Sequence, residues 1–141
     1  MIRELVKEDL EEVMSIWLET NLKVHDFIEA DYWKRNFEAV KEALLQAEVY
    51  VYIEDTKIKG FIGIVEDYIA GIFVAEPYRS QGIGKQLISK AKQLYSHLSL
   101  SVYVKNNQAV SFYSREGFEI IKEQEDEHTH EKEYVMKYEG V

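Results

Sequence analysis

The sequence predicts an α+β protein with a mixed, mostly antiparallel sheet of six to seven strands, flanked by about four helices. Along the chain, apolar residues alternate between the two-residue period of strands and the three-to-four-residue period of helices. Several β-rich runs follow one another across short turns, which favours antiparallel pairing. We expect residues 1–141 to form one domain, because no internal repeat or Pro/Gly/Ser-rich linker interrupts them.

The N-terminal third predicts one strand and two helices. Met1–Val6 is the strand, and Asp9 is expected to cap the first helix. That helix carries apolar residues at helical spacing, namely Leu10, Val13, Met14, Trp17 and Leu18. After a break at 21–26, the pattern predicts a second helix over 30–46. Its apolar face consists of Trp33, Phe37, Val40 and Leu44.

The central part predicts three strands. Val49–Ile53 and Ile58–Val65 form a hairpin around Asp55-Thr56-Lys57. Asp67–Val74 is the next strand, with Gly71 inside it. Because a glycine within a strand often marks a bulge or a close approach by a ligand, we expect one of these at Gly71.

The C-terminal half predicts two helices and three strands. Gly82–Tyr95 is a helix whose inward residues are Ile83, Leu87, Ile88, Ala91 and Leu94. Leu98–Val104 returns to strand, and Gln108–Arg115 is a short helix. Two tail strands, Phe118–Glu125 and Lys132–Tyr138, are joined by an acidic turn.

Composition argues against several classes of function. The net charge of −9 disfavours general binding to nucleic acids and to anionic membranes. The chain has no cysteine, so it contains neither disulfides nor a thiolate nucleophile. We expect a cytoplasmic protein, because the N-terminus lacks a signal-peptide pattern and no apolar run approaches the ~20 residues of a membrane span.

A basic, glycine-rich turn lies between a strand and a helix. It reads Arg79-Ser80-Gln81-Gly82-Ile83-Gly84-Lys85. The N-terminus of a helix presents unpaired N–H groups, and its macrodipole adds roughly half a positive charge there. Gly82 and Gly84 leave room for a ligand, while Arg79 and Lys85 add positive charge. This pattern predicts a phosphate site.

Two well-known nucleotide loops do not fit this turn. The Walker A loop needs a glycine six residues before its lysine, where this chain has Arg79, and Ser or Thr after it, where this chain has Gln86. The dinucleotide fingerprint fails because Leu87 occupies the third glycine position. A plain connection between a strand and a helix remains the alternative.

The residues around the turn resemble the acetyl-coenzyme A signature of the GNAT superfamily of N-acetyltransferases. The matching segments are Ile72-Phe73-Val74, Pro77-Tyr78-Arg79, Gly82-Ile83-Gly84 and Leu87. A second stretch resembles that family's N-x-x-A-x-x-F-Y…G-F segment through Asn106, Ala109, Phe112-Tyr113 and Gly117-Phe118. His25-Asp26-Phe27-Ile28 is similar to a segment of small, single-domain bacterial members.

The resemblance implies an acetyl-CoA-dependent N-acetyltransferase that acts by direct transfer to a primary amine in a ternary complex. The absence of cysteine argues against an acetyl-cysteine intermediate. The residues that the resemblance assigns to acetyl-CoA are Ile72, Phe73, Val74, Arg79, Ser80, Gln81, Gly82, Ile83, Gly84, Lys85, Asn106 and Tyr113.

The resemblance also makes Tyr113 the general acid that protonates the departing thiolate. The alternative for Tyr113 is a buried aromatic anchor. Three residues are candidates for the general base: Glu66 and Asp67 at the start of the central strand, and His25 in the loop between the first helices. A solvated carboxylate pair and a structural histidine are the alternatives, and water can replace a dedicated base.

Other interpretations remain open at this point. The histidines in the acidic tail turn, His128 and His130, suggest a metal site, but a solvated hairpin fits their spacing better, so we expect no metal. The acceptor is a small-molecule amine or a peptide amine. The competing functions are a non-catalytic acyl-CoA-binding or sensing module and a protein lysine or N-terminal acetyltransferase that needs a specific polypeptide. A homodimer formed through the tail strands is compatible with the sequence.

Overall fold

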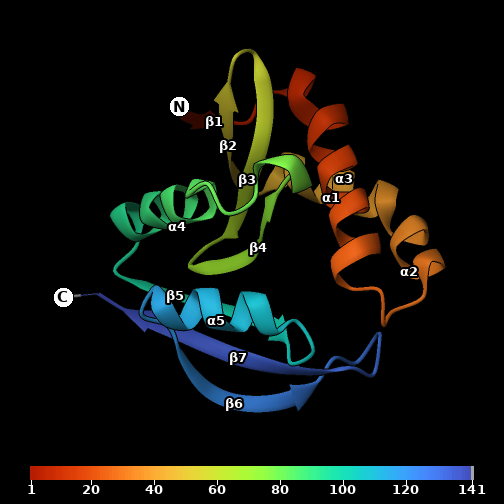
Figure 1. The fold of residues 1–141 in the computed structure, drawn as a ribbon, viewed down its shortest axis with the longest axis vertical. Coiled ribbons are helices and arrows are strands. Elements are labelled where there is room, and N and C mark those ends of the chain that lie inside the picture. Colours follow the sequence, from red (N-terminus) through yellow and green to blue (C-terminus); the bar gives the residue numbers. More distant parts are fainter. Residues whose placement is uncertain (141) are drawn as a thin grey trace.

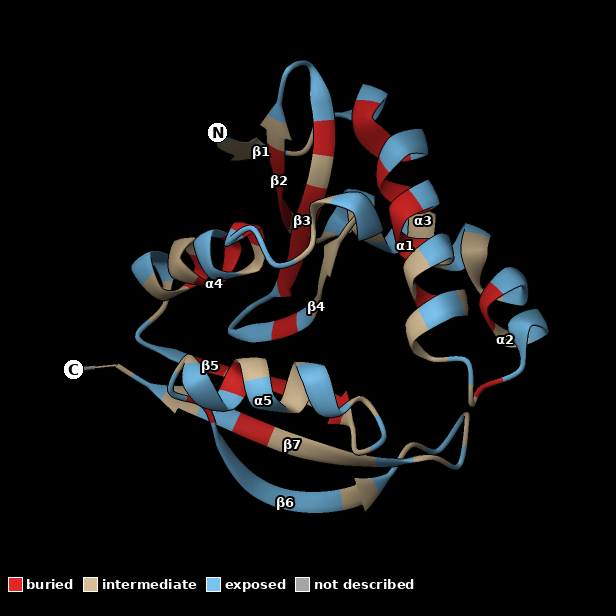
Figure 2. Ribbon diagram, viewed as in Figure 1, coloured by how far each residue is buried: buried red, intermediate tan, exposed pale blue. Residues whose placement is uncertain are grey.

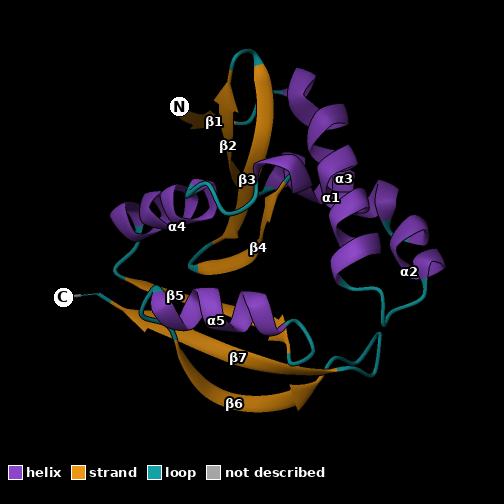
Figure 3. Cartoon of the chain, viewed as in Figure 1, coloured by secondary structure: helices purple, strands orange, loops and turns teal. Residues whose placement is uncertain are grey.

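The structure is a computed structural model that describes residues 1–140, and these residues form a seven-stranded sheet with helices on both faces (Figures 1 and 3). The strand order is β1-β2-β3-β4-β5-β7-β6, in which β4–β5 is the parallel pair and the other pairs are antiparallel. The strands are β1 (Ile2–Glu4), β2 (Glu48–Glu54), β3 (Lys57–Val65), β4 (Tyr68–Val74), β5 (His97–Tyr103), β6 (Glu119–Glu125) and β7 (Lys132–Glu139). The helices are η1 (Lys7–Asp9), α1 (Leu10–Val24), α2 (Ala30–Arg35), α3 (Phe37–Gln46), η2 (Glu76–Tyr78), α4 (Ile83–Leu94) and α5 (Asn107–Arg115). The predicted α+β class and mixed sheet are confirmed. Val141, the last residue of the predicted domain, lies outside the described residues.

Each face of the sheet has its own apolar cluster, because successive side chains of a strand point to opposite faces. In β2, Val49 and Val51 pack with α1–α3, whereas Tyr50 and Tyr52 pack with the cluster of α4 and α5. Figure 2 shows the buried residues of β2 and β3 between the helices. None of the helices within residues 1–140 is long and apolar enough to cross a membrane.

Strands β4 and β5 pair only at their beginnings and then diverge. Their parallel register holds for Tyr68 with Ser99 and for Ile69 with Leu100. Beside this point, the β3–β4 register shifts so that Ala70 is an extra residue in β4, next to Gly71. A bulge of this kind bends its strand and increases its twist. The predicted irregularity at Gly71 is therefore confirmed, and the open end of β4 faces a gap in the sheet.

The predicted helix over 30–46 is wrong in one respect, since the structure contains two helices that meet at Asn36. The Asn36 side chain donates from Nδ2 to the Tyr32 carbonyl at 2.7 Å. An amide that bonds to nearby backbone competes with the helical ladder, and here the chain changes direction at that residue. The inward position of Leu94 is also wrong: α4 ends there, and this side chain is 41% exposed.

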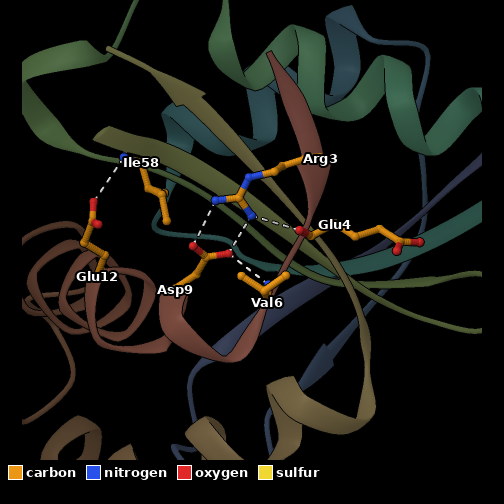
Figure 4. A network of polar contacts seen from close by, with 6 residues as sticks. All are labelled: Arg3, Glu4, Val6, Asp9, Glu12 and Ile58. Carbon is orange, nitrogen blue, oxygen red and sulfur yellow. Dashed lines mark hydrogen bonds and ion pairs between the residues drawn. The ribbon is translucent and has the colours of Figure 1, made fainter. Parts of the chain in front are cut away.

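Asp9 does not cap α1, contrary to the prediction. Its carboxylate accepts from Nη1 and Nη2 of Arg3 at 2.7 and 3.0 Å and from the Val6 N–H at 2.9 Å (Figure 4). The bond from Arg3 is the main cause that lowers the pKa of Asp9. A second carboxylate, Glu12, accepts from the Ile58 N–H at 3.0 Å in the same view. These contacts attach η1 and the first turn of α1 to strands β1 and β3.

Candidate active site

A cleft of about 1150 Å³ opens where β4 and β5 diverge. Its walls come from the end of β4, the glycine turn, the first turn of α4, one face of α5 and the C-terminal turn of α1. All the residues predicted to bind the cofactor line this cleft except Gln81, which is exposed and donates to the Pro77 carbonyl at 3.4 Å. Segments more than 80 positions apart in the sequence thus meet around one space.

The glycine turn leads into α4 through left-handed backbone. Ser80 has φ of 64° and Gly82 has φ of 83°. The left-handed conformation costs a non-glycine residue roughly 1–2 kcal/mol, so the rest of the fold must hold Ser80 in place. Within residues 1–140, no side chain caps α4 at Gly82, and a Cβ built there would meet no atom within 4 Å. The first amides of α4 therefore lack helical partners beside open space, as in an anion-binding helix terminus.

The cleft carries positive charge on an acidic protein. Three basic residues line it, namely Arg79, Lys85 and Arg115, together with one acidic residue, Glu116. Arg79 donates from Nε to the Val74 carbonyl at 3.2 Å, which anchors its guanidinium beside the end of β4. Such a concentration of cations raises the local affinity for an anion despite the net charge of −9.

The free edge of β4 offers backbone donors to the cleft. The Ala75 N–H donates to the Lys59 carbonyl beside β3, at 2.9 Å. Because peptide groups alternate in direction along a strand, the N–H groups of Ile72 and Val74 point away from β3. Strand β5 has diverged here, so these groups face the cleft rather than another strand.

Tyr113 lies on α5 and is 9% exposed. Its ring packs edge-on against Phe112 and Phe118, with centroid distances of 5.3 and 5.7 Å. Burial raises the pKa of Tyr113 above its ordinary value of 10.0, and the nearby Tyr68 adds to this effect. The phenol is therefore protonated at neutral pH and is able to donate a hydrogen bond.

His25 also lines the cleft, and both its ring nitrogens have partners. Nδ1 lies 2.8 Å from Asn21 Oδ1, and Nε2 lies 3.1 Å from Asn106 Nδ2. Burial lowers its pKa from 6.5 to about 4. A histidine with so low a pKa is a weak base, and its basic nitrogen already accepts a hydrogen bond.

The two other base candidates lie elsewhere. Glu66 and Asp67 occupy the exposed turn between β3 and β4, at the opposite end of β4 from Ile72 and Val74, and neither lines the cleft. In the tail hairpin, His130 Nδ1 lies 3.1 Å from Glu125 Oε2 on an exposed surface. Among residues 1–140, no group of three or more His, Cys, Asp or Glu side chains is arranged to hold a metal ion.

Sequence reasoning missed one face of α5 and the last turn of α1. Gln108, Ser111 and Arg115 all line the cleft. Their spacing of three and four residues places them on one side of the helix, and this polar stripe was a readable signal. Thr20 and Val24 also line the cleft, but they carry no comparable pattern.

Comparison with known proteins agrees with this geometry. The model of the acetyltransferase (GNAT) domain family matches residues 11–139. The peptidyl-lysine N-acetyltransferase YiaC of Escherichia coli (strain K12) is 40% identical over 123 residues, which are 86% of this chain and 84% of YiaC. The peptidyl-lysine N-acetyltransferase YjaB of Salmonella typhimurium is 32% identical over 120 residues, covering 84% of this chain and 83% of YjaB.

Solved structures show the same fold. The solution structure of apo-form YjaB from Escherichia coli superimposes with a TM-score of 0.86 at 26% identity, covering 100% of this chain and 98% of that one. The PaiA N-acetyltransferase of Thermoplasma acidophilum, solved in complex with coenzyme A, gives a TM-score of 0.82 at 20% identity, covering 99% and 98%. With its diverging β4 and β5, its glycine turn and its family match, this chain belongs to the GNAT family of N-acetyltransferases.

Proposed function

We propose that this protein transfers an acetyl group from acetyl-CoA to the side-chain amine of a lysine in a polypeptide, by direct transfer in a ternary complex. The observation that carries the proposal is the single cleft that joins the first turn of α4, the free edge of β4 and Tyr113. Its volume of about 1150 Å³ exceeds that of most small-ligand pockets, as an extended donor such as acetyl-CoA requires.

The donor's parts correspond to parts of the cleft. The pyrophosphate is assigned to the free amides that follow Gly82, with Arg79 and Lys85 beside them. The pantetheine arm is assigned to the unpaired edge of β4, where it adds hydrogen bonds as an extra strand would. The N–H of Ile72 is the donor that we assign to the acetyl carbonyl, since it points into the cleft beside the gap in the sheet.

The transfer itself needs few protein groups. The amine nitrogen forms a bond to the carbonyl carbon, the carbon–sulfur bond breaks, and the sulfur leaves with the bonding electron pair. Tyr113 donates its hydroxyl proton to that thiolate and regains a proton from the amine through water. Because the chain has no cysteine, no acetyl-cysteine intermediate enters the route.

No side chain is assigned as a dedicated base in this proposal. Glu66 and Asp67 lie in the turn at the far end of β4, and the basic nitrogen of His25 is occupied by Asn106. An acceptor lysine therefore loses the proton of its ammonium to solvent before attack. The expected consequence is a rate that rises with pH as the neutral amine becomes more abundant.

The choice of a lysine acceptor is supported by similarity to YiaC and YjaB, which are named peptidyl-lysine N-acetyltransferases. To test it, acetyl-CoA is offered with a lysine-containing peptide blocked at its N-terminus, a peptide whose only amine is its N-terminus, and spermidine. Release of CoA is measured with a thiol reagent, and the protein adds no background because it contains no cysteine.

Acetylation of the lysine peptide alone supports the full proposal. Preference for the N-terminal amine or for spermidine contradicts the lysine acceptor while leaving the transferase in place. Binding of acetyl-CoA without CoA release, with these acceptors and with protein lysines in a cell extract, would identify a non-catalytic acyl-CoA-binding module instead.

A further inference from the structure

A chain of side-chain hydrogen bonds crosses one end of the cleft, from α1 to α5. Asn21 Nδ2 donates to the Trp17 carbonyl at 3.0 Å, and Asn21 Oδ1 lies 2.8 Å from His25 Nδ1. On the other side of the ring, His25 Nε2 lies 3.1 Å from Asn106 Nδ2, and Asn106 Oδ1 accepts from the Ala109 N–H at 3.2 Å. We name these four side-chain hydrogen bonds the Asn21–His25–Asn106 relay.

The two ends of the relay determine which nitrogen of His25 carries the proton. The Trp17 carbonyl can only accept, so the Asn21 amide presents its oxygen to Nδ1. The Ala109 N–H can only donate, so the Asn106 amide presents its NH₂ group to Nε2. His25 must then donate from Nδ1 and accept at Nε2. The relay is satisfied only by the neutral ring with its proton on Nδ1.

Aromatic rings pack against His25 and leave it half-buried at the wall of the cleft. The ring stacks on Trp33 at a centroid distance of 5.7 Å and an interplanar angle of 28°. Tyr103 and Phe27 contact it edge-on at 5.0 and 5.7 Å. Hydrogen bonds in such a partly buried place are stronger than in bulk water, and the loss of a partner leaves a polar group unpaired.

The relay ends on the cap of the helix that carries Tyr113. Asn106 is the N-cap of α5, and Tyr113 follows it by seven residues, which is two turns along the same side of the helix. Asn21 is 1% exposed and belongs to α1, whose apolar cluster with the sheet contains no residue of α5. His25 therefore connects the start of α5 to a fixed support across the cleft.

We propose that His25 is a positioning residue, which as the neutral Nδ1–H tautomer joins α1 to the N-cap of α5 and so places Tyr113 in the cleft. The proposal rests on the function proposed above for Tyr113, but its structural half can be tested without any transfer activity. It assigns His25 a role other than general base.

The first test is the tautomer, read from the long-range ¹H–¹⁵N NMR spectrum of the imidazole at pH 7. We expect Nδ1 to give a protonated, pyrrole-like signal and Nε2 an unprotonated one, with His97, His128 and His130 as exposed references in the same spectrum. An Nε2–H tautomer or an imidazolium at His25 would overturn the relay.

Reversing the polarity of one partner sharpens this test. In the Asn106→Asp variant, one carboxylate oxygen still accepts from the Ala109 N–H. The other oxygen faces Nε2 of His25 and can only accept a hydrogen bond, so Nε2 must carry a proton to donate one. His25 should then take up a proton at neutral pH, and both ring nitrogens should become pyrrole-like. An unchanged His25 spectrum in this variant would contradict the contact with Asn106.

The second test separates positioning from proton transfer. His25→Phe keeps a ring of similar size but removes both hydrogen bonds, and His25→Gln restores an acceptor for Asn106. We expect His25→Phe to lower kcat about tenfold with little change in the KM for acetyl-CoA, and His25→Gln to recover part of that loss. Amide exchange at Ala109 should be faster in His25→Phe than in wild type. His97→Phe, at an exposed position at the start of β5, is the control and should behave as wild type.

Each outcome decides the proposal. If the tautomer is as expected but kcat is unchanged in His25→Phe, the relay exists without positioning Tyr113, and the proposal fails. A limb of the kcat–pH profile between pH 6 and 8 that His25→Gln abolishes would make His25 a proton acceptor and also overturn it. If no acceptor is acetylated at all, the proposed function fails, while the NMR spectra and Ala109 exchange still decide the relay.

Discussion

Acidification should destabilise this protein through His25, and the size of the effect follows from its burial. In the folded protein the pKa of His25 is about 4, because the half-buried ring is partly desolvated, whereas in the unfolded chain the pKa is about 6.5. At pH values between about 4 and 6.5, His25 is protonated in the unfolded chain but mostly neutral in the folded protein. The free energy of unfolding therefore falls as the pH is lowered through this window, and the contribution is lost completely only below pH 4.

The expected magnitude is large compared with the stability of a domain of this size. The difference between the two pKa values corresponds to about 3 kcal/mol over the whole window. About 2 kcal/mol of this is already lost on going from pH 7.5 to pH 5. Small proteins have total stabilities of only about 5–15 kcal/mol, so the loss is easily measured. The titratable group that contacts the His25 ring is the Tyr103 phenol, and burial raises its pKa, so it stays neutral in this range.

The assay is urea unfolding at several pH values between 4.5 and 7.5, for wild type and for His25→Gln. The variant has no titrating group at position 25, so its stability should depend less on pH. We expect the difference in the free energy of unfolding between the two proteins to shrink by about 2 kcal/mol from pH 7.5 to pH 5. His97→Gln, which removes an exposed histidine, should keep the wild-type pH dependence.

Parallel curves for wild type and His25→Gln would refute the reasoning. They would mean that His25 binds its proton equally well in the folded and unfolded states, which is incompatible with an acceptor nitrogen held by Asn106.

Three further predictions concern the cleft and its support. Tyr113→Phe should lower kcat on the order of 100-fold while leaving acetyl-CoA affinity nearly unchanged, as measured by steady-state kinetics and calorimetry; an unaltered kcat would remove Tyr113 from the mechanism. Gly82→Val should abolish acetyl-CoA binding in calorimetry, because φ is 83° there and a side chain would enter the proposed phosphate site. Arg79→Glu should do the same by reversing a charge, and wild-type affinity in either variant would contradict the proposed site. Asp9→Asn should lower the free energy of unfolding by about 2 kcal/mol at pH 7, because it leaves Arg3 without its anionic partner. Urea unfolding curves that coincide with those of wild type would show that this ion pair does not stabilise the protein.

Local patterns predicted much of this protein, because strands, helices and turns depend on residues that are near one another in the sequence. Apolar periodicity located all seven strands to within a few residues, and the glycine turn was placed between β4 and α4. The errors were also local in origin. At Asn36 an amide competes with the helix, and at Asp9 the carboxylate bonds to Arg3 instead of to the helix start.

The sequence by itself thus determined the fold class, the position of the glycine turn and the family resemblance, all of which depend on short-range spacing. Only the tertiary structure decided which of the candidate residues meet. Glu66 and His25 were both candidates for the general base in the sequence. In the structure, Glu66 lies in an exposed turn, whereas His25 bridges Asn21 and Asn106, and Asn106 is 81 positions away from His25. The physical reason is that such a contact depends on how α1 and α5 pack against the sheet, and on the point where β4 and β5 part. These distances are set by the whole core and by no local pattern.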